Sequence, residues 1–144
     1  KNKAAGPVWS PDGKKIAFST GWGGHSEIYV MNADGTDLTR ITYTVSPWDH
    51  NLVWSPDSQK IAFLSYRDGN YEIYTVNADG TDLVNLTNSP EDEGDQVWSA
   101  DGTKIAFISS RDGSSGIFVI DSDGSNLTRL TNSNTYDYSL TWSP

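Results

Sequence analysis

The chain of 144 residues contains no cysteine, so it can form neither a disulfide nor a thiolate metal site. It has no apolar run approaching the roughly 20 residues of a membrane-spanning helix, and we expect no membrane insertion. Basic residues are scarce: 10 Lys and Arg face 19 Asp and Glu, giving a formal net charge of −9. This charge disfavours nucleic acid and anionic membranes as partners and favours basic partners. The alternative interpretation is that the charge only keeps the protein soluble.

The common catalytic patterns are absent as well. There is no G-x-S-x-G nucleophile motif, and no glycine-rich loop precedes a helical pattern. No stretch shows the 3.6-residue apolar period of a helix. We therefore expect a protein that is not an enzyme and that carries no cofactor.

What the chain does contain is a repeat. VWSPDGKKIAF begins at Val8 and returns as VWSPDSQKIAF from Val53 and as VWSADGTKIAF from Val97. The marker tryptophans follow one another at intervals of 45, 44 and 44 residues: Trp9, Trp54, Trp98 and Trp142. A period of this length is typical of propeller blades with four strands each.

Each repeat carries four strand signals. In the first repeat they are the segment ending at Trp9, then residues 15–19, 27–32 and 38–42. The middle strands have apolar residues on both faces, which indicates a sheet that is covered on both sides. Ser-Pro-Asp-Gly and Ala-Asp-Gly mark two hairpin turns. The apolar residues of 38–42 do not alternate, which favours an edge strand with a bulge.

We predict an all-β fold of three antiparallel four-stranded blades, at about residues 4–42, 49–87 and 93–131, with the first strand of a further blade at about 137–144. Successive hairpins turn at opposite ends of a sheet, so the Asp-Gly turns share one face of the array. The other face, which we call the variable face, carries loops that differ in length, charge and aromatic content. Varied loops on a rigid scaffold are typical of binding sites, and we expect the function there.

The string WSPDGKKIAF, followed by EIYVMNADGTDLTRIT, resembles the repeat of TolB-type β-propellers. Related blades occur in tricorn-like and prolyl-oligopeptidase-like propellers. The resemblance covers nearly the whole chain three times over. Departures are Ala100 for the turn proline, Ser58 for the turn glycine, and Gly-Trp-Gly-Gly at 21–24 for an Arg-Asp-Gly loop. The resemblance implies a setting in the periplasm or cell envelope of a bacterium.

The resemblance also bears on assembly, because TolB-type propellers close at six blades. Three blades form an arc with an apolar face open at each end, and repeat arrays need capping or closure. Two copies would complete a six-bladed ring, so we expect a homodimer, with an open arc or another ring size as the alternative. One first-strand segment per chain is then surplus, and it either swaps into the partner or lies displaced.

An acidic residue stands five positions before each later marker tryptophan: Asp49, Glu93 and Asp137. Ala4 takes this place before Trp9. At the entry to the innermost strands, these acids would surround the mouth of a central channel and could hold a divalent cation or a basic peptide. Salt bridges with Arg67 and Arg111 on the same face are the alternative interpretation.

Other candidate binding residues also belong to the variable face. Asp95 ends the densest acidic cluster, Glu91–Asp95, which lacks the ligand spacing of an EF-hand. His25 and His50 show no metal-binding spacing. The loop aromatic residues are Trp22, Tyr43, Trp48, Tyr66, Tyr71, Tyr136 and Tyr138. Aromatic side chains are favoured binding anchors and also stack on sugar rings, whereas packing between blades is the alternative.

The favoured function is therefore a protein- or peptide-binding scaffold that uses the variable face and the acidic channel mouth. A propeller that binds a carbohydrate or another small ligand is one alternative. A gating propeller fragment of a hydrolase is the other.

Overall fold

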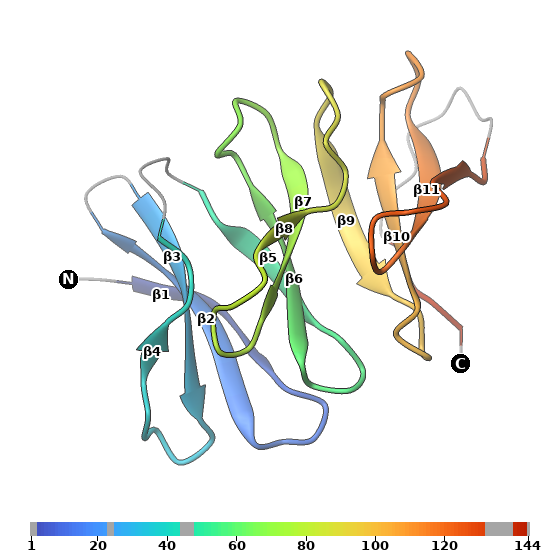
Figure 1. Ribbon diagram of the computed structural model, residues 1–144. Coiled ribbons are helices and arrows are strands. Elements are labelled where there is room, and N and C mark those ends of the chain that lie inside the picture. Colours follow the sequence, from blue (N-terminus) through green and yellow to red (C-terminus); the bar gives the residue numbers. More distant parts are fainter. Residues whose placement is uncertain (1–2, 23–24, 44–47, 132–139, 144) are drawn as a thin grey trace.

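The computed structural model describes residues 3–22, 25–43, 48–131 and 140–143. Within these residues, twelve strands form three separate four-stranded antiparallel sheets, and each sheet takes its strands in chain order. The sheets stand side by side from the N-terminal to the C-terminal end of the molecule (Figure 1). The predicted all-β fold of three blades is confirmed. No helix that could cross a membrane occurs in the described part of the chain.

The strands of each blade are short and follow the repeat. Blade 1 comprises β1 (Lys3–Trp9), β2 (Lys15–Trp22), β3 (His25–Asn32) and β4 (Thr39–Arg40). Blade 2 comprises β5 (His50–Trp54), β6 (Lys60–Ser65), β7 (Glu72–Asn77) and β8 (Val84–Asn85). Blade 3 comprises β9 (Glu93–Trp98), β10 (Lys104–Ser109), β11 (Gly116–Asp121) and β12 (Thr128–Arg129). Of the predicted further strand at about 137–144, residues 140–143 are described and belong to no strand, and the other residues lie outside the described part of the chain.

The outer strand of each blade is shorter than its sequence predicts. In blade 1 the strand covers Thr39–Arg40 instead of 38–42, although Ile41 still donates its N–H to the carbonyl of Ile28 at 2.9 Å. The hydroxyl of Thr42 then accepts the N–H of Ile28 at 2.9 Å, in place of a backbone carbonyl. The same bond recurs from Ile73 to Thr87 and from Ile117 to Thr131. A threonine side chain therefore ends the hydrogen-bond ladder in every blade.

Two apolar clusters lie between neighbouring blades. We call the side of a blade toward the next blade its forward face, and the opposite side its backward face. The first cluster joins the forward face of blade 1 (Ala17, Ile28, Val30 and Ile41) to the backward face of blade 2 (Leu52, Trp54, Ile61, Phe63, Tyr74 and Val76). The second joins the forward face of blade 2 (Ala62, Leu64, Ile73 and Leu86) to the backward face of blade 3 (Trp98, Ile105, Phe107, Phe118 and Ile120). The core is thus built from two copies of one forward-to-backward contact.

The marker tryptophans link each blade to the preceding one. The indole N–H of Trp54 donates to the carbonyl of Val8 at 3.1 Å, and that of Trp98 donates to the carbonyl of Val53 at 3.2 Å. Both indoles combine this bond with burial of their apolar rings, which suits an amphipathic side chain. The repeated tryptophan therefore connects blades in addition to filling the core.

The Ser-Pro-Asp-Gly turns are fixed by an aspartate. In blade 3, Asp101 accepts bonds from the Ser99 hydroxyl at 2.6 Å and from the N–H of Thr103 at 3.0 Å. These bonds, with that from Ser99 the larger influence, lower the pKa of Asp101 to about 2. Ser58, which replaces the turn glycine of blade 2, has a positive φ of 62°. Its hydroxyl accepts the N–H of Asp12 at 3.1 Å, so it joins two turns of neighbouring blades.

Asp101→Asn should lower the melting temperature at pH 7 by a few degrees, because the folded chain loses a charged acceptor. The pKa of Asp101 in the folded chain, about 2, lies below the 3.8 that is usual for an aspartate. The stabilisation is therefore complete above about pH 4 and is lost as the pH falls through about 2. Thermal melts between pH 7 and pH 2 should show that the melting temperatures of the wild type and of Asp101→Asn converge as the pH falls. Glu91→Gln, in an exposed loop, is the control, and a pH-independent gap for Asp101→Asn would contradict the mechanism.

The Ala-Asp-Gly turns contain an exchangeable pair. Asn77 donates to Asp82 at 2.8 Å, and Asn32 donates to Asp37 at 2.6 Å in the same way. In blade 3 the two residue types have changed places, since the amide of Asn126 donates to Asp121 at 2.7 Å. One amide and one carboxylate are therefore needed, in either order.

Asn77→Asp should lower the midpoint of urea unfolding, because it sets two carboxylates against each other across the turn of blade 2. Adding Asp82→Asn should restore the midpoint, since the double variant has the arrangement already present in blade 3. Asp82→Asn alone is the matched control. If the double variant is less stable than both single variants, the idea that one amide and one carboxylate can stand here in either order is wrong.

Candidate functional site

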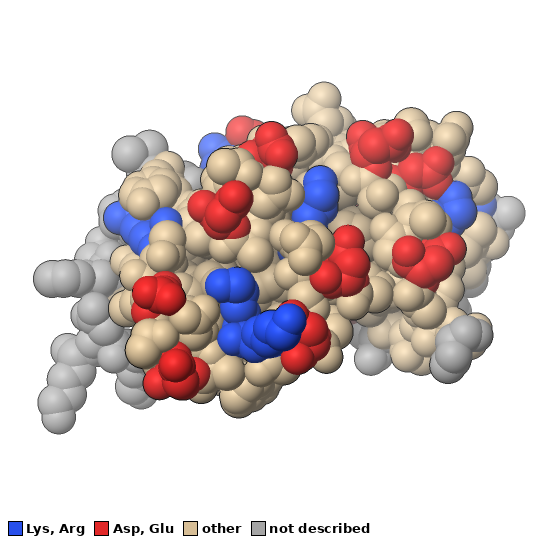
Figure 2. Space-filling view, turned by 60° about the horizontal axis from the view of Figure 1, so that its bottom comes forward, with Lys and Arg blue, Asp and Glu red and all other residues tan. Residues whose placement is uncertain are grey.

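The loops of the variable face gather at the upper edge of the three blades in Figure 1, opposite the Asp-Gly turns of blades 1 and 2 at the lower edge. The opposite side of the molecule carries acidic side chains spread over its surface, with a few basic side chains among them (Figure 2). Lys14, at an Asp-Gly turn of blade 1, lies 3.7 Å from Asp12. The turn side visible in Figure 2 therefore offers no continuous patch of one sign.

Asp49, at the entry to β5, is fully buried rather than facing a channel. Its carboxylate lies 3.3 Å from a guanidinium nitrogen of Arg67. Arg67 also donates to the Ser65 hydroxyl at 2.8 Å, and its guanidinium lies 4.3 Å from the ring centre of Tyr74. Burial raises the pKa of Asp49, against the lowering influence of Ser65 and Arg67.

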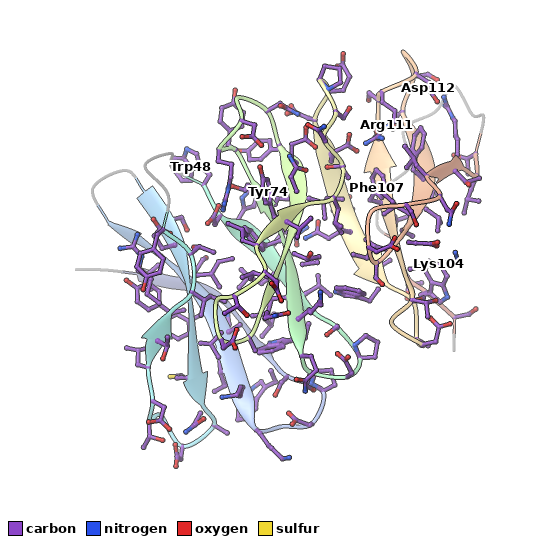
Figure 3. The ribbon with its side chains drawn as sticks, viewed as in Figure 1. Trp48, Tyr74, Lys104, Phe107, Arg111 and Asp112 are labelled. Carbon is purple, nitrogen blue, oxygen red and sulfur yellow. The ribbon has the colours of Figure 1, made fainter. Side chains whose placement is uncertain are left out.

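Glu93, at the start of β9, repeats this arrangement. Its Oε1 lies 2.7 Å from a guanidinium nitrogen of Arg111 and accepts the Ser109 hydroxyl at 3.1 Å. Arg111 lies above the ring of Phe107 at the upper end of blade 3 (Figure 3), 5.3 Å from the ring centre. The other oxygen, Oε2, is buried and has no hydrogen-bond partner among the described residues. Burial again raises the pKa of the carboxyl group.

These contacts bear directly on the two interpretations of the acidic positions. Asp49 and Glu93 are each engaged by an arginine of the same blade, so neither presents a free carboxylate to a channel. Within the residues that the structure describes, no three His, Cys, Asp or Glu side chains lie close enough together to hold a metal ion. Asp137 lies outside the described residues. The geometry therefore agrees with salt bridges at these two positions.

Blade 1 lacks both members of the pair. Ala4 pairs with Thr20 in the β1–β2 ladder, as Glu93 pairs with Ser109 in blade 3. Two positions after Thr20, Trp22 stands where the other blades have arginine. The side chain of Trp22 is outside the described part of the structure. Because acid and arginine are present or absent together, the sequence already contained the signal that they act as a pair.

A bulge in each innermost strand exposes a different residue. Gly6, Asn51 and Asp95, each three positions before a marker tryptophan, have positive φ values of 59°, 55° and 50°. The ladder register shifts at these points in all three blades. Asp95 is exposed, so the bulge in β9 presents one of the predicted binding carboxylates to solvent.

Four residues above blade 2 make up what we call the aromatic cluster: Trp48, His50, Tyr66 and Tyr71. The predicted loop residue Tyr43 is not among them, and its ring centre lies 4.6 Å from the guanidinium of Arg40. The ring centre of Tyr71 lies 5.2 Å from that of His50 and 5.0 Å from that of Tyr66, in edge-on arrangements. Trp48 is 53% exposed and Tyr66 is 38% exposed. Trp48 lies at the upper edge of the molecule (Figure 3). Tyr136 and Tyr138 lie outside the described residues.

A small cavity of about 190 Å³ adjoins the cluster between blades 1 and 2, with Gly6, Ser19 and His50 among its lining residues. Ser19 is one of the short side chains that line it. The equivalent residues of blades 2 and 3 are the larger Leu64 and Ile108. The sequence reading missed this cavity, although the change from Leu and Ile to Ser within an otherwise repeated strand was its signal.

A family model described as the TolB beta propeller domain matches residues 1–69 and 49–144. The chain belongs to the TolB β-propeller family. Among solved structures, a TolB-type protein of Agrobacterium tumefaciens is 27% identical with a TM-score of 0.76, and the match covers 90% of this chain and 50% of that one. TolB of Acinetobacter baumannii is 29% identical with a TM-score of 0.72, covering 87% of this chain and 31% of that one. This chain therefore spans half or less of these relatives.

Blades of the same fold also occur in an enzyme. A puromycin-hydrolyzing peptidase of Mycobacterium tuberculosis is 20% identical with a TM-score of 0.73, over 89% of this chain and 22% of that one. At this identity the likeness shows the fold alone. No curated protein sequence matches the chain closely enough to identify a relative.

Proposed function

We propose that this TolB-family chain is a non-enzymatic binding module, and that a protein or peptide docks on its aromatic cluster and on Asp95. The observation that supports this most directly is the exposure of Trp48 and Tyr66 close to Tyr71, whose ring contacts those of both His50 and Tyr66. Exposed aromatic side chains held by ring contacts lose little freedom on binding and are frequent hot spots of interfaces.

Charge favours a basic partner. The chain has a formal net charge of −9, and Glu91, Asp92 and Asp95 are exposed in and beside β9. A basic segment would be steered toward this edge over distances of about 10 Å at moderate ionic strength. The buried acids Asp49 and Glu93 act indirectly here, because they hold the arginines that lie beneath the loops.

The chemistry of the cluster does not favour catalysis. In the described residues, His50 packs its ring against Tyr71 and has one nitrogen 3.4 Å from the carbonyl of Trp48. No serine or cysteine is hydrogen-bonded to His50 within that part of the chain, so the pairing of nucleophile and base that covalent catalysis needs is not assembled there. We also propose that the protein works in the bacterial cell envelope, a location that its membership of the TolB family supports.

The test is a selection of peptides from a random 12-residue phage library on the immobilised wild-type chain at low ionic strength, followed by calorimetry with the synthesised peptides. We expect basic peptides whose affinity falls at least about 30-fold in Trp48→Ala with Tyr66→Ala. Asp95→Asn should weaken binding mainly at low salt. Leu83→Ala, in blade 2 on the Asp-Gly side, should change nothing.

Two results would overturn the proposal. One is a set of selected peptides that bind the aromatic double variant as tightly as the wild type. The other is failure to select any peptide while an oligosaccharide panel changes the tryptophan fluorescence in a way that disappears with Trp48→Ala. That second result would favour the carbohydrate-binding alternative instead.

A further inference from the structure

The two ends of the blade row present faces that elsewhere in the chain are covered. Within the described residues, no blade covers the backward face of blade 1 and no complete blade covers the forward face of blade 3. In the interior of the chain, a forward face packs against a backward face twice, with equivalent residues both times. Each open face is therefore complementary to the other one.

Trp9 shows what the open backward face lacks. It is 59% exposed, whereas the equivalent Trp54 and Trp98 are 6% and 7% exposed. Phe18 and Tyr29 on the same face are partly exposed, although the equivalent phenylalanines Phe63 and Phe107 are fully buried. The face keeps the aromatic side chains of an inter-blade contact without a blade against them.

Leu130 shows the same for the open forward face. It is 60% exposed, whereas the equivalent residues Ile41 and Leu86 are 3% and 5% exposed. Ile117, on the same face, is partly exposed, whereas the equivalent Ile73 is fully buried. The opposite ends of the chain thus carry the two halves of one contact, and both halves are apolar.

We propose that a second copy of this chain covers both ends, its blade 1 packing on blade 3 of the first copy and its blade 3 on blade 1. The contact continues the interface that already occurs twice inside the chain, and the partner's Trp9 indole would donate to the carbonyl of Val97 as Trp54 does to Val8. Because the two faces differ, a single contact leaves one of each open. A two-fold pair makes two identical contacts and leaves none.

The C-terminal segment is a competitor for one of these places. Trp142 occupies the repeat position of a marker tryptophan and is partly buried, as is Leu140. Because Trp142 stands at the next marker position of the repeat, we expect it to compete with the partner's Trp9 for the place beside Val97. Trp142→Ala should therefore strengthen the association.

The first experiment measures the absolute mass of the full chain by light scattering coupled to size exclusion, at tens of micromolar. The chain has a mass of 15.8 kDa, so a closed pair weighs about twice that value. We expect this single species, without growth at higher concentration. A monomer would overturn the proposal, and so would a series of larger species, because an open chain of head-to-tail contacts is not a closed pair.

Variants distinguish the proposed contact from any other dimer. Trp9→Asp and Leu130→Asp should each raise the dissociation constant by at least about 30-fold, since each places a charge at the centre of an apolar contact. Leu83→Asp changes an exposed leucine in the middle blade and should leave the constant within about threefold. Circular dichroism verifies that each variant retains its sheet. If Trp9→Asp stays dimeric, or if Trp142→Ala abolishes the dimer, the proposed contact is wrong.

This inference does not depend on the peptide-binding proposal. Trp9 and Leu130 lie outside the aromatic cluster, and the mass is measured without any ligand. A monomer that still selects basic peptides would overturn the closed pair alone, and a dimer that selects none would overturn the binding function alone.

Discussion

Glu93→Ala should lower the free energy of unfolding by about 3–5 kcal/mol, which is the usual cost of removing one partner from a buried ion pair. Glu93 is 4% exposed, and the side chain of Arg111 is only 13% exposed. Without the carboxylate, the guanidinium stays against Phe107 and Phe118 with the Ser109 hydroxyl as its remaining acceptor in the described structure. The loss therefore reflects a buried charge without a counter-ion rather than the strength of one salt bridge.

Adding Arg111→Trp to Glu93→Ala should recover most of that loss. The double variant has the residues that blade 1 carries at the same positions, Ala4 and Trp22. Replacing a buried ion pair by apolar residues of similar total volume is often neutral or stabilising. Arg111→Trp alone should be destabilising, because it leaves the Glu93 carboxylate buried and unpaired.

Urea unfolding at one fixed protein concentration measures these differences. Glu93→Gln is the matched control, because it keeps the shape of the side chain and a hydrogen-bond acceptor. Its free energy of unfolding should lie between that of the wild type and that of Glu93→Ala. Two outcomes would contradict the account. One is a loss below about 1 kcal/mol for Glu93→Ala, and the other is a double variant less stable than both single variants.

The sequence predicted the blades because their local rules agree with one another. Alternating apolar residues, Asp-Gly turns and a 44- to 45-residue spacing all indicate the same four strands. The outer strand was predicted too long, because sequence patterns do not show that Thr42 supplies a side-chain acceptor where a backbone carbonyl is expected.

The site could be predicted only in part. Asp49 and Glu93 and their arginines were recognised, but the sequence left both a channel ring and salt bridges open, because it did not show which way the acids point. The bulges at Asn51 and Asp95 decide this, since an extra residue breaks the two-residue alternation of a strand. The signal available in the sequence was the choice of Gly, Asn and Asp at this position of the three repeats, because these residue types tolerate a positive φ. The cavity beside Ser19 was missed although the sequence carried its signal, a serine where the other two repeats have Leu64 and Ile108.

Phe63→Ala should lower the free energy of unfolding by about 3–5 kcal/mol, as expected for removing a fully buried phenylalanine from a packed core. Phe63 is 0% exposed between blades 1 and 2, and its ring lies 5.9 Å from that of Tyr74. Truncation leaves a cavity that two sheets would have to shift to fill.

Phe18→Ala is the matched control for Phe63→Ala, because Phe18 has the same place in blade 1 and a similar stacked neighbour, Tyr29, at 6.0 Å. It lies on the open backward face, so in a dilute monomer its truncation should cost less than about 1.5 kcal/mol. If two copies close as proposed, its cost should rise with protein concentration, since Phe18 then enters an inter-blade contact. The cost of Phe63→Ala should show no such extra dependence. Equal costs at every concentration would mean that blade 1 is not an end, and the pairing of the two open faces would lose its structural basis.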